Sequence, residues 1–240
     1  MCPPSSSMSM MKEEGRTRRS APTCSAIKAK IMNEPHHYNA DSIDEKTVDR
    51  DPLKLFQRWL HDAKAVGIQL AEAMTLATAT PDGKPSARLV LLKQADEQGF
   101  VFYTNYESMK ARELDANPQA ALVFYWPQLE RQVRVEGKVE RVSAAESDAY
   151  FKTRPRESQI GALASPQSEV IASREALQEK ADELEEFYEG REVERPAHWG
   201  GYRLRAERIE FWKGRPGRLH DRINYERQAD GSWTIKRLAP

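Results

Sequence analysis

Hydrophobic and polar residues alternate with a period of two along much of the chain, which predicts a protein built mainly of β-strands. In Arg131–Val142, for example, Val133, Val135 and Val139 share one face, and polar residues occupy the other. Turn-forming residues such as Pro81-Asp82-Gly83-Lys84 separate neighbouring strands. The predicted strands are Ala73–Thr80, Ser86–Lys93, Phe100–Thr104, Ala120–Trp126, Arg131–Val142, Tyr202–Trp212, Arg218–Arg227 and Trp233–Leu238.

Other segments have apolar residues three or four positions apart, which predicts helices before and between the strands. Asp51-Pro52 can begin the first of these, and Ser143 with Glu146 forms a capping box at another. The predicted helices are Pro52 to about Gly67, Ser108–Ala116, Ser143 to about Arg154, and Ser173–Tyr188. Because the strands follow in hairpin order without regular strand–helix alternation, the pattern favours a mainly β, α+β fold: an antiparallel barrel with flanking helices.

The first 50 residues have a different composition from the rest. They are rich in Ser, Pro, Met and charge and contain one aromatic residue, Tyr38. We therefore predict a mobile N-terminal tail over residues 1–50 and a single domain over residues 51–240. Cys2 and Cys24 both lie in this tail, which favours a reducing, cytoplasmic location. An organelle-targeting segment over residues 12–30 and a start at Met32 are the alternatives.

Charge and motif composition exclude several classes of protein. The 37 basic residues balance the 37 acidic ones, which argues against a nucleic-acid-binding protein. The longest apolar run, Ala121–Trp126, is far shorter than a membrane span. No glycine-rich nucleotide loop, C-x-x-C or H-E-x-x-H motif is present, and we interpret His36-His37 as a solvated pair rather than a metal site.

Three clusters of hydrogen-bond donors are the candidates for chemistry. On a strand, Arg218, His220 and Arg222 would form a row on one face, suited to an anionic or electron-rich ligand. From spacing alone, a solvated edge strand is the favoured alternative. Arg88 and Lys93 flank a four-residue apolar run, although strand-end charges meeting water explain them equally well.

The third cluster combines Tyr150 and Arg154, which lie one helical turn apart, with the nearby Ser158. Two hydroxyls and a guanidinium can hold a phosphate, although a structural tyrosine beside a surface arginine is the alternative. Together the clusters are rich in donors and poor in acids. This combination indicates a small phosphorylated ligand rather than acid–base hydrolysis.

Eight motifs then follow one another in a family-specific order between about Asp51 and Pro240. They are Arg88–Lys93 (RLVLLK), Phe102–Asn105 (FYTN), Glu130–Val133 (ERQV), Arg154-Pro155 with Ser158–Gly161, Trp199–Gly201 (WGG), Glu210–Trp212 (EFW), Arg218–Arg222 (RLHDR) and Arg237–Pro240 (RLAP). In this order they resemble the pyridoxine/pyridoxamine 5′-phosphate oxidase family. The resemblance implies a homodimeric split barrel that binds flavin mononucleotide (FMN) at the subunit interface. It also implies oxidation of pyridoxine 5′-phosphate or pyridoxamine 5′-phosphate to pyridoxal 5′-phosphate, with O2 reduced to H2O2.

The resemblance also implies roles for individual residues. The cofactor-binding residues would be Arg88, Leu89, Val90, Leu91, Leu92, Lys93, Tyr103, Thr104, Lys110, Gln132, Gln167, Ser168, Trp212 and Arg222. The substrate phosphate would be bound by Lys93, Tyr150, Arg154 and Ser158. Arg218 and His220 would be the catalytic residues, lying over the substrate ring.

Three positions depart from the family pattern. Met109 stands where the family has arginine in S-R-K, so one cationic contact to the flavin phosphate is missing. Pro35–Tyr38 replaces an arginine-containing lid segment, and Gln69–Glu72 lacks an acidic-proline pair. The competing hypothesis is a split-barrel protein that binds flavin or haem without oxidase turnover. The presence of all five predicted substrate residues disfavours it.

Overall fold

The computed structural model describes residues 41–240, in which a single antiparallel sheet forms a half-barrel with flanking helices. The strands are β1 (Ala73–Ala79), β2 (Pro85–Leu91), β3 (Gln94–Asp96), β4 (Gly99–Asn105), β5 (Gln119–Trp126), β6 (Arg131–Arg141), β7 (Trp199–Lys213), β8 (Asp221–Arg227) and β9 (Trp233–Leu238). Their order is β2-β1-β5-β6-β7-β4-β3, and β8 joins β7 to β9. The predicted fold class is confirmed.

The helices are α2 (Pro52–Ala65), α3 (Met109–Ala116), α4 (Ala144–Lys152), α5 (Arg156–Ala164) and α6 (Arg174–Phe187). The Asp51 side chain caps α2 by accepting a hydrogen bond from the Leu53 amide at 2.9 Å, as the sequence predicted. The apolar face of α2 packs on the sheet, with Phe56 edge-on to Phe124 and Trp59 edge-on to Phe211. No helix in the described part of the chain has the length and apolar character needed to span a membrane.

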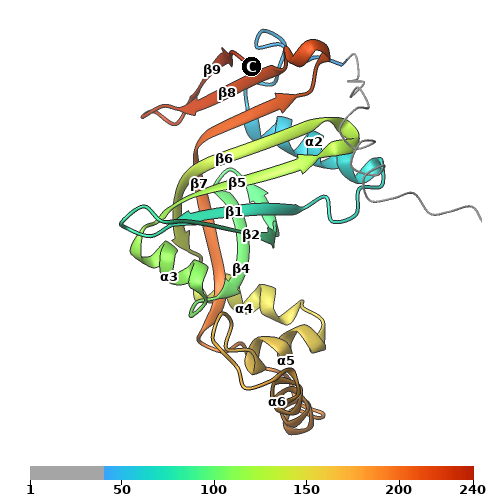
Figure 1. Cartoon of the computed structure of the whole chain (residues 1–240), viewed down its shortest axis with the longest axis vertical. Coiled ribbons are helices and arrows are strands. Elements are labelled where there is room, and N and C mark those ends of the chain that lie inside the picture. The colour runs from blue at the N-terminus through green and yellow to red at the C-terminus, as the bar shows by residue number, and fades with distance from the viewer. Residues whose placement is uncertain (1–40) are drawn as a thin grey trace, which may run out of the picture. The chain divides into compact units, whose positions relative to one another are not determined.

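Strand β7 connects the two regions that matter for the site. Its first half pairs with β4 and its second half with β8, while β6 accompanies it along most of its length. A bulge at Glu136/Gly137 lets the long β6–β7 pair bend; a Cβ on Gly137 would lie 2.0 Å from the Arg205 carbonyl oxygen. Helices α4 to α6 gather near the beginning of β7, and β8 and β9 lie near its end (Figure 1).

Residues 41–50 contact the domain, although the sequence placed them in the tail. The Ile43 amide donates to Asp221 at 3.4 Å, and the Asp49 carbonyl accepts from the Tyr225 hydroxyl at 2.7 Å. The side chains of Ile43 and Val48 pack against the core. This stretch therefore belongs with the domain, while the predicted mobility of residues 1–40 and the Pro35–Tyr38 lid position lie outside the described residues.

Two further elements differ from the prediction. Helix α5 was not predicted, because Pro155 was interpreted only as the end of α4, whereas it also stands at the N-cap position of a new helix. Strand β8 begins at Asp221, three residues later than predicted. Pro216–Arg218 forms a short 3-10 turn, in which Gly217 (φ 68°) and Arg218 (φ 62°) are left-handed and cannot continue a strand.

Candidate functional site

A cavity of about 770 Å³ opens between β2, β4, α3 and the α4–α5 corner. Its volume lies within the range typical of small-molecule sites. It brings together many of the predicted site residues: Leu89, Val90, Leu91, Lys93, Tyr103, Thr104, Lys110, Tyr150, Arg154, Ser158 and Gln167. Residues from both the predicted cofactor set and the predicted substrate set thus line one cavity.

Three stacked aromatic rings form part of the cavity wall. The Tyr103 and Tyr150 ring centroids lie 4.0 Å apart at an interplanar angle of 19°, and the Trp199 ring lies 5.4 Å from Tyr103 at 11°. Gly201 permits this packing, since a Cβ there would lie 2.8 Å from the Tyr103 ring. Burial raises the pKa of the Tyr103 hydroxyl to about 12, so it stays protonated at neutral pH.

Arg154 lies against this aromatic wall with an incompletely satisfied charge. Its guanidinium carbon is 4.5 Å from the centre of the Trp199 ring. The Nη1 atom is buried and has no hydrogen-bond partner among the described residues. Burial also lowers the pKa of the Arg154 guanidinium, with Tyr150 opposing the shift. A buried charged donor without an acceptor is costly, and an anion in the cavity would satisfy it.

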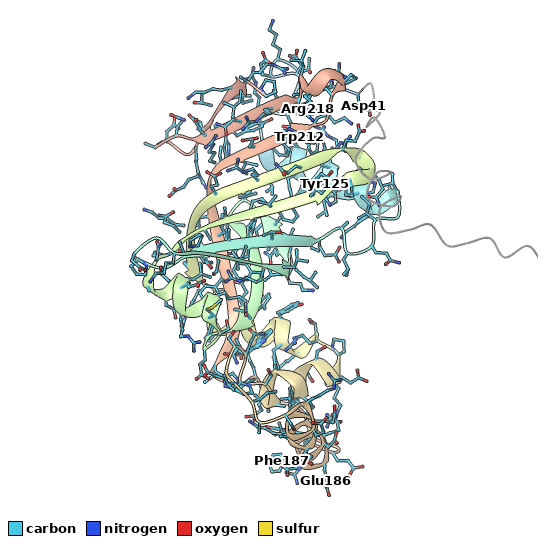
Figure 2. The ribbon with its side chains drawn as sticks, viewed as in Figure 1. Asp41, Tyr125, Glu186, Phe187, Trp212 and Arg218 are labelled. Carbon is cyan, nitrogen blue, oxygen red and sulfur yellow. The ribbon has the colours of Figure 1, made fainter. Side chains whose placement is uncertain are left out.

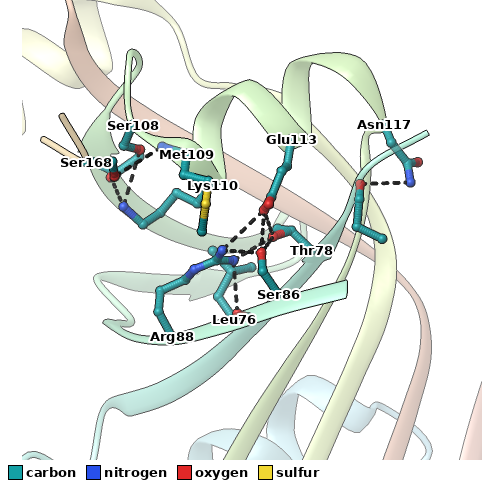
Figure 3. A network of polar contacts seen from close by, with 12 residues as sticks. Leu76, Thr78, Ser86, Arg88, Ser108, Met109, Lys110, Glu113, Asn117 and Ser168 are labelled. Carbon is teal, nitrogen blue, oxygen red and sulfur yellow. Dashed lines mark hydrogen bonds and ion pairs between the residues drawn. The ribbon is translucent and has the colours of Figure 1, made fainter. Parts of the chain in front are cut away.

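Lys110 is a second cation at the cavity wall, and oxygen atoms surround it (Figure 3). Its Nζ atom donates to Gln167 Oε1 at 2.8 Å and to the hydroxyls of Thr104 and Ser108 at 3.2 Å each. Burial, helped by the nearby charge of Arg88 and partly opposed by Glu113, lowers the pKa of Lys110 to about 8. Lys110 is therefore positioned to bind an anion at neutral pH.

Arg88 is not among the residues that line this cavity, and its guanidinium belongs to a polar network with Thr78, Ser86 and Glu113 (Figure 3). Its Nη1 atom donates to Thr78 Oγ1 at 2.5 Å, and its Nη2 atom donates to Ser86 Oγ at 2.5 Å and to Glu113 Oε2 at 3.2 Å. Burial alone would raise the pKa of the Glu113 carboxyl, but hydrogen bonds from Ser86, Thr78 and Arg88 hold it below its usual value. Leu92 is buried and also does not line the cavity.

Ser168 is likewise outside the lining, but it lies directly beside the cavity. Its hydroxyl accepts a hydrogen bond from the Met109 amide at 3.2 Å, at the beginning of α3. The Met109 side chain is 48% exposed. Arg112, which could have replaced the missing family arginine, instead pairs with Glu169 at 2.9 Å.

The remaining predicted residues form a second cluster on β6, β7 and β8. Gln132, Trp212 and Arg222 are direct cross-strand neighbours and therefore share one face of the sheet. The His220 ring lies 4.7 Å from the Trp212 ring. Figure 2 shows where Trp212 and Arg218 of this cluster lie. The predicted strand row of Arg218, His220 and Arg222 is wrong, because strand β8 begins only after His220.

The two clusters do not meet within one chain. Trp199 lines the cavity at the beginning of β7, whereas Trp212 lies near the end of the same strand. At about 3.3 Å per residue, the strand between them spans roughly 40 Å. A single copy of the chain therefore presents two separate clusters of predicted site residues.

Sequence reasoning missed several residues of the cavity wall, namely Asn105, Thr153, Pro155, Gly161, Ala162, Ser165 and Trp199. Trp199 carried a usable signal, because the rare tryptophan stands before two glycines in the WGG motif. Glu113 gave no such signal, since its ion-pair partner Arg88 comes from another element. Glu210 stands in the EFW motif, but its pairing with Arg222 could not be predicted from that motif.

The fold and the cavity define the class: a split-barrel protein whose cavity is lined by cationic side chains and an aromatic wall. A family model described as pyridoxamine 5′-phosphate oxidase matches residues 60–188. A second model, described as the pyridoxine 5′-phosphate oxidase C-terminal dimerisation region, matches residues 199–240. The chain belongs to the pyridoxine/pyridoxamine 5′-phosphate oxidase family, as the sequence motifs indicated.

Curated relatives agree with this assignment. A pyridoxine/pyridoxamine 5′-phosphate oxidase of Rubrobacter xylanophilus is 58% identical over 203 residues, covering 85% of this chain and 93% of the relative. The enzyme of the same name from Trichormus variabilis is 54% identical over 203 residues, covering 85% and 95%.

Solved structures share the fold. PhzG from Burkholderia lata, solved in complex with tetrahydrophenazine-1-carboxylic acid, superposes with a TM-score of 0.80 at 32% identity, covering 85% of this chain and 99% of PhzG. A pyridoxamine 5′-phosphate oxidase-related, FMN-binding protein from Nostoc punctiforme has a TM-score of 0.63 at 18% identity, covering 78% and 96%. The second likeness supports the fold alone.

Proposed function

We propose that this chain is an FMN-dependent oxidase that converts pyridoxine 5′-phosphate or pyridoxamine 5′-phosphate to pyridoxal 5′-phosphate, reducing O2 to H2O2. The observation that carries the proposal is the buried, unpartnered Nη1 atom of Arg154 in a cavity that Lys93 and Ser158 also line. These groups suit the phosphate of a small substrate. The cytoplasmic location expected from the sequence is part of the same proposal.

The residues present also fit FMN. Lys110, Thr104 and Gln167 offer a cation, a hydroxyl and an amide at one edge of the cavity, and the Ser168 hydroxyl lies beside them. This donor set suits the flavin phosphate, in agreement with the family resemblance. When bound, FMN would supply the two-electron oxidation and the reaction with O2.

The chain's own residues would bind and orient the substrate. Arg154, Lys93 and Ser158 would hold its phosphate, and Tyr150 would pack beside it from the aromatic wall. Arg218 and His220 would act from the second cluster, positioning the substrate ring and stabilising charge as the aldehyde or imine forms. For the amine substrate, water then hydrolyses the imine.

A homodimer would bring the two clusters together. The match of residues 199–240 to a dimerisation region supports it. So do two large apolar side chains on the sheet, since Leu89 is 73% exposed and Tyr125 is 55% exposed in the single chain. The second cluster of one copy would then complete the cavity of the other.

An absorbance spectrum and a peroxide assay test the proposal. The purified protein should be yellow or take up one FMN per chain, and it should produce H2O2 when pyridoxine 5′-phosphate is added under air. A colourless protein that takes up no FMN on reconstitution would contradict the proposal.

The same assay separates the alternatives. FMN uptake without peroxide would favour a split-barrel binding protein without turnover. Binding of tetrahydrophenazine-1-carboxylic acid, the ligand in the PhzG complex, without turnover of pyridoxine 5′-phosphate would favour a ligand like that of PhzG. The phosphate-binding set of Arg154, Lys93 and Ser158 favours the phosphorylated substrates.

A further inference from the structure

The Arg222 guanidinium is held by protein groups on two sides. Its Nε and Nη2 atoms donate to the two carboxylate oxygens of Glu210 at 2.9 and 3.0 Å. Its Nη1 atom donates to the carbonyl oxygen of Ala239 at 2.9 Å. A bidentate carboxylate fixes the plane of a guanidinium, and a third acceptor fixes its direction within that plane.

The C-terminal residues are themselves anchored beside Arg222. Leu238 of β9 is its direct cross-strand neighbour. Arg237 donates to Asp221 Oδ1 at 2.6 Å and to Glu45 Oε2 at 2.7 Å, which ties β9 to the residue before Arg222. The terminal RLAP motif thus has a structural role next to a predicted cofactor contact.

Glu210 is only 3% exposed, although it carries a charge. A buried ion pair contributes little net stability, because desolvation offsets most of the attraction. The pair has a larger effect on the orientation of the Arg222 guanidinium. A guanidinium has five N–H groups, and the bonds described above use three of Arg222's, leaving one on each terminal nitrogen for a ligand.

We infer that Glu210 and the Ala239 carbonyl are positioning groups, which aim the two remaining N–H groups of Arg222 at the flavin. The last residues of the chain are therefore part of the cofactor site. This inference rests on the proposed function, since it takes FMN as the cofactor, and on the family resemblance, which implies that Arg222 contacts FMN.

A double-mutant cycle tests the role of Glu210. Apo-protein is titrated with FMN for the wild type, Glu210→Gln, Arg222→Gln and the double variant. We expect Glu210→Gln to weaken FMN binding about tenfold in the wild-type background and less than about twofold beside Arg222→Gln, since coupled residues are non-additive. Melting curves and size-exclusion profiles show that each variant keeps its fold and association state. Equal weakening in both backgrounds would mean that Glu210 supports only the fold, which would overturn the inference.

Two truncations test the Ala239 carbonyl independently, even if Glu210→Gln fails to fold. Removing Pro240 alone keeps an oxygen acceptor on Ala239 and serves as the matched control. Removing Ala239 and Pro240 together deletes the acceptor and should weaken FMN binding about fivefold, the loss of one charged hydrogen bond. Equal FMN affinity in both truncations would overturn this part. If the wild type binds FMN but no variant changes its affinity, only this inference fails; a wild type that binds no FMN removes the proposed function as well.

Discussion

Lys110 lies among oxygen atoms at the cavity wall, and its protonation controls how the wall receives an anion. Because burial lowers its pKa to about 8, Lys110 is charged at pH 7 and loses its proton as the pH rises through 8. We expect FMN affinity to be constant below this pH and to fall above it, by at most about tenfold per pH unit for one titrating group. Titrating apo-protein with FMN from pH 6.5 to 9.5 measures this.

The Lys110→Met variant is the control for this pH dependence. It should bind FMN more weakly than the wild type below pH 8, show no fall near pH 8, and differ less from the wild type at pH 9.5. Tyr103 does not interfere, since its pKa of about 12 lies above the range. A wild-type affinity that stays constant up to pH 9.5 would show that Lys110 does not contact the phosphate.

Met109 is the second residue with a direct consequence for FMN binding. Its side chain is exposed and its backbone amide bonds to Ser168, so an arginine there need not enter the core. Met109→Arg should tighten FMN binding by about 1–2 kcal/mol, roughly five- to thirtyfold, through charge-assisted hydrogen bonds. The gain should shrink at high salt. Titrations of apo-protein at two salt concentrations measure both effects.

Arg112→Met provides the matched comparison. Arg112 pairs with Glu169 at the surface, so its loss should leave FMN affinity unchanged. If Arg112→Met weakened binding and Met109→Arg did not tighten it, Arg112 would be the residue that replaces the family arginine.

At the scale of secondary-structure elements, the sequence predicted what local chemistry determines. Alternating valines defined β6, and the Asp51 and Ser143 caps defined where α2 and α4 begin. The beginning of β8 was not predictable from alternation, because the left-handed Arg218 backbone depends on the preceding Pro216-Gly217 turn. The Glu113 network was also hidden, since its partners come from β1 and β2, far away in sequence.

The corner between α4 and α5 holds a side chain that lowers the stability of the fold but is suited to binding an anion. Arg154 keeps a buried donor without a partner there, which costs about 1–3 kcal/mol. Arg154→Met removes this unsatisfied donor and keeps an apolar side chain against Trp199, but it loses a cation–π contact. Because the first effect outweighs the second, we expect the free energy of unfolding to rise by about 1 kcal/mol. The KM for pyridoxine 5′-phosphate should rise about ten- to hundredfold. Denaturant unfolding and steady-state kinetics measure the two effects.

Arg156→Met, two residues along, is the control. The Arg156 guanidinium already pairs with Glu185 and two carbonyl oxygens, so its loss should lower stability and leave KM unchanged. Inorganic phosphate should raise the melting temperature of the wild type more than that of Arg154→Met. A less stable Arg154→Met protein would show that the donor is satisfied after all.

At the scale of the whole molecule, the sequence motifs gave the residues of both clusters but not the distance between the clusters. The order of motifs along the sequence does not give the distance between them in space. In the structure, Trp199 and Trp212 lie at opposite ends of the long strand β7. The predicted catalytic pair, Arg218 and His220, is therefore far from the cavity that its own chain contains. A site shared between the two chains of a homodimer would bring Arg218 and His220 to the cavity. It predicts an outcome that a site within one chain would not give.

Mixing two impaired variants, assayed at a substrate concentration far below the raised KM, tests the shared site. Arg154→Met damages only the cavity cluster, and His220→Leu only the second cluster, so each homodimer has two impaired sites. After unfolding and refolding of an equal mixture, half of the dimers combine one chain of each kind. Each such dimer has one site with both defects and one with neither, so the mixture should recover about a quarter of wild-type activity. Activity that stays at the level of the separate variants, although mixed dimers form, would place each complete site within one chain.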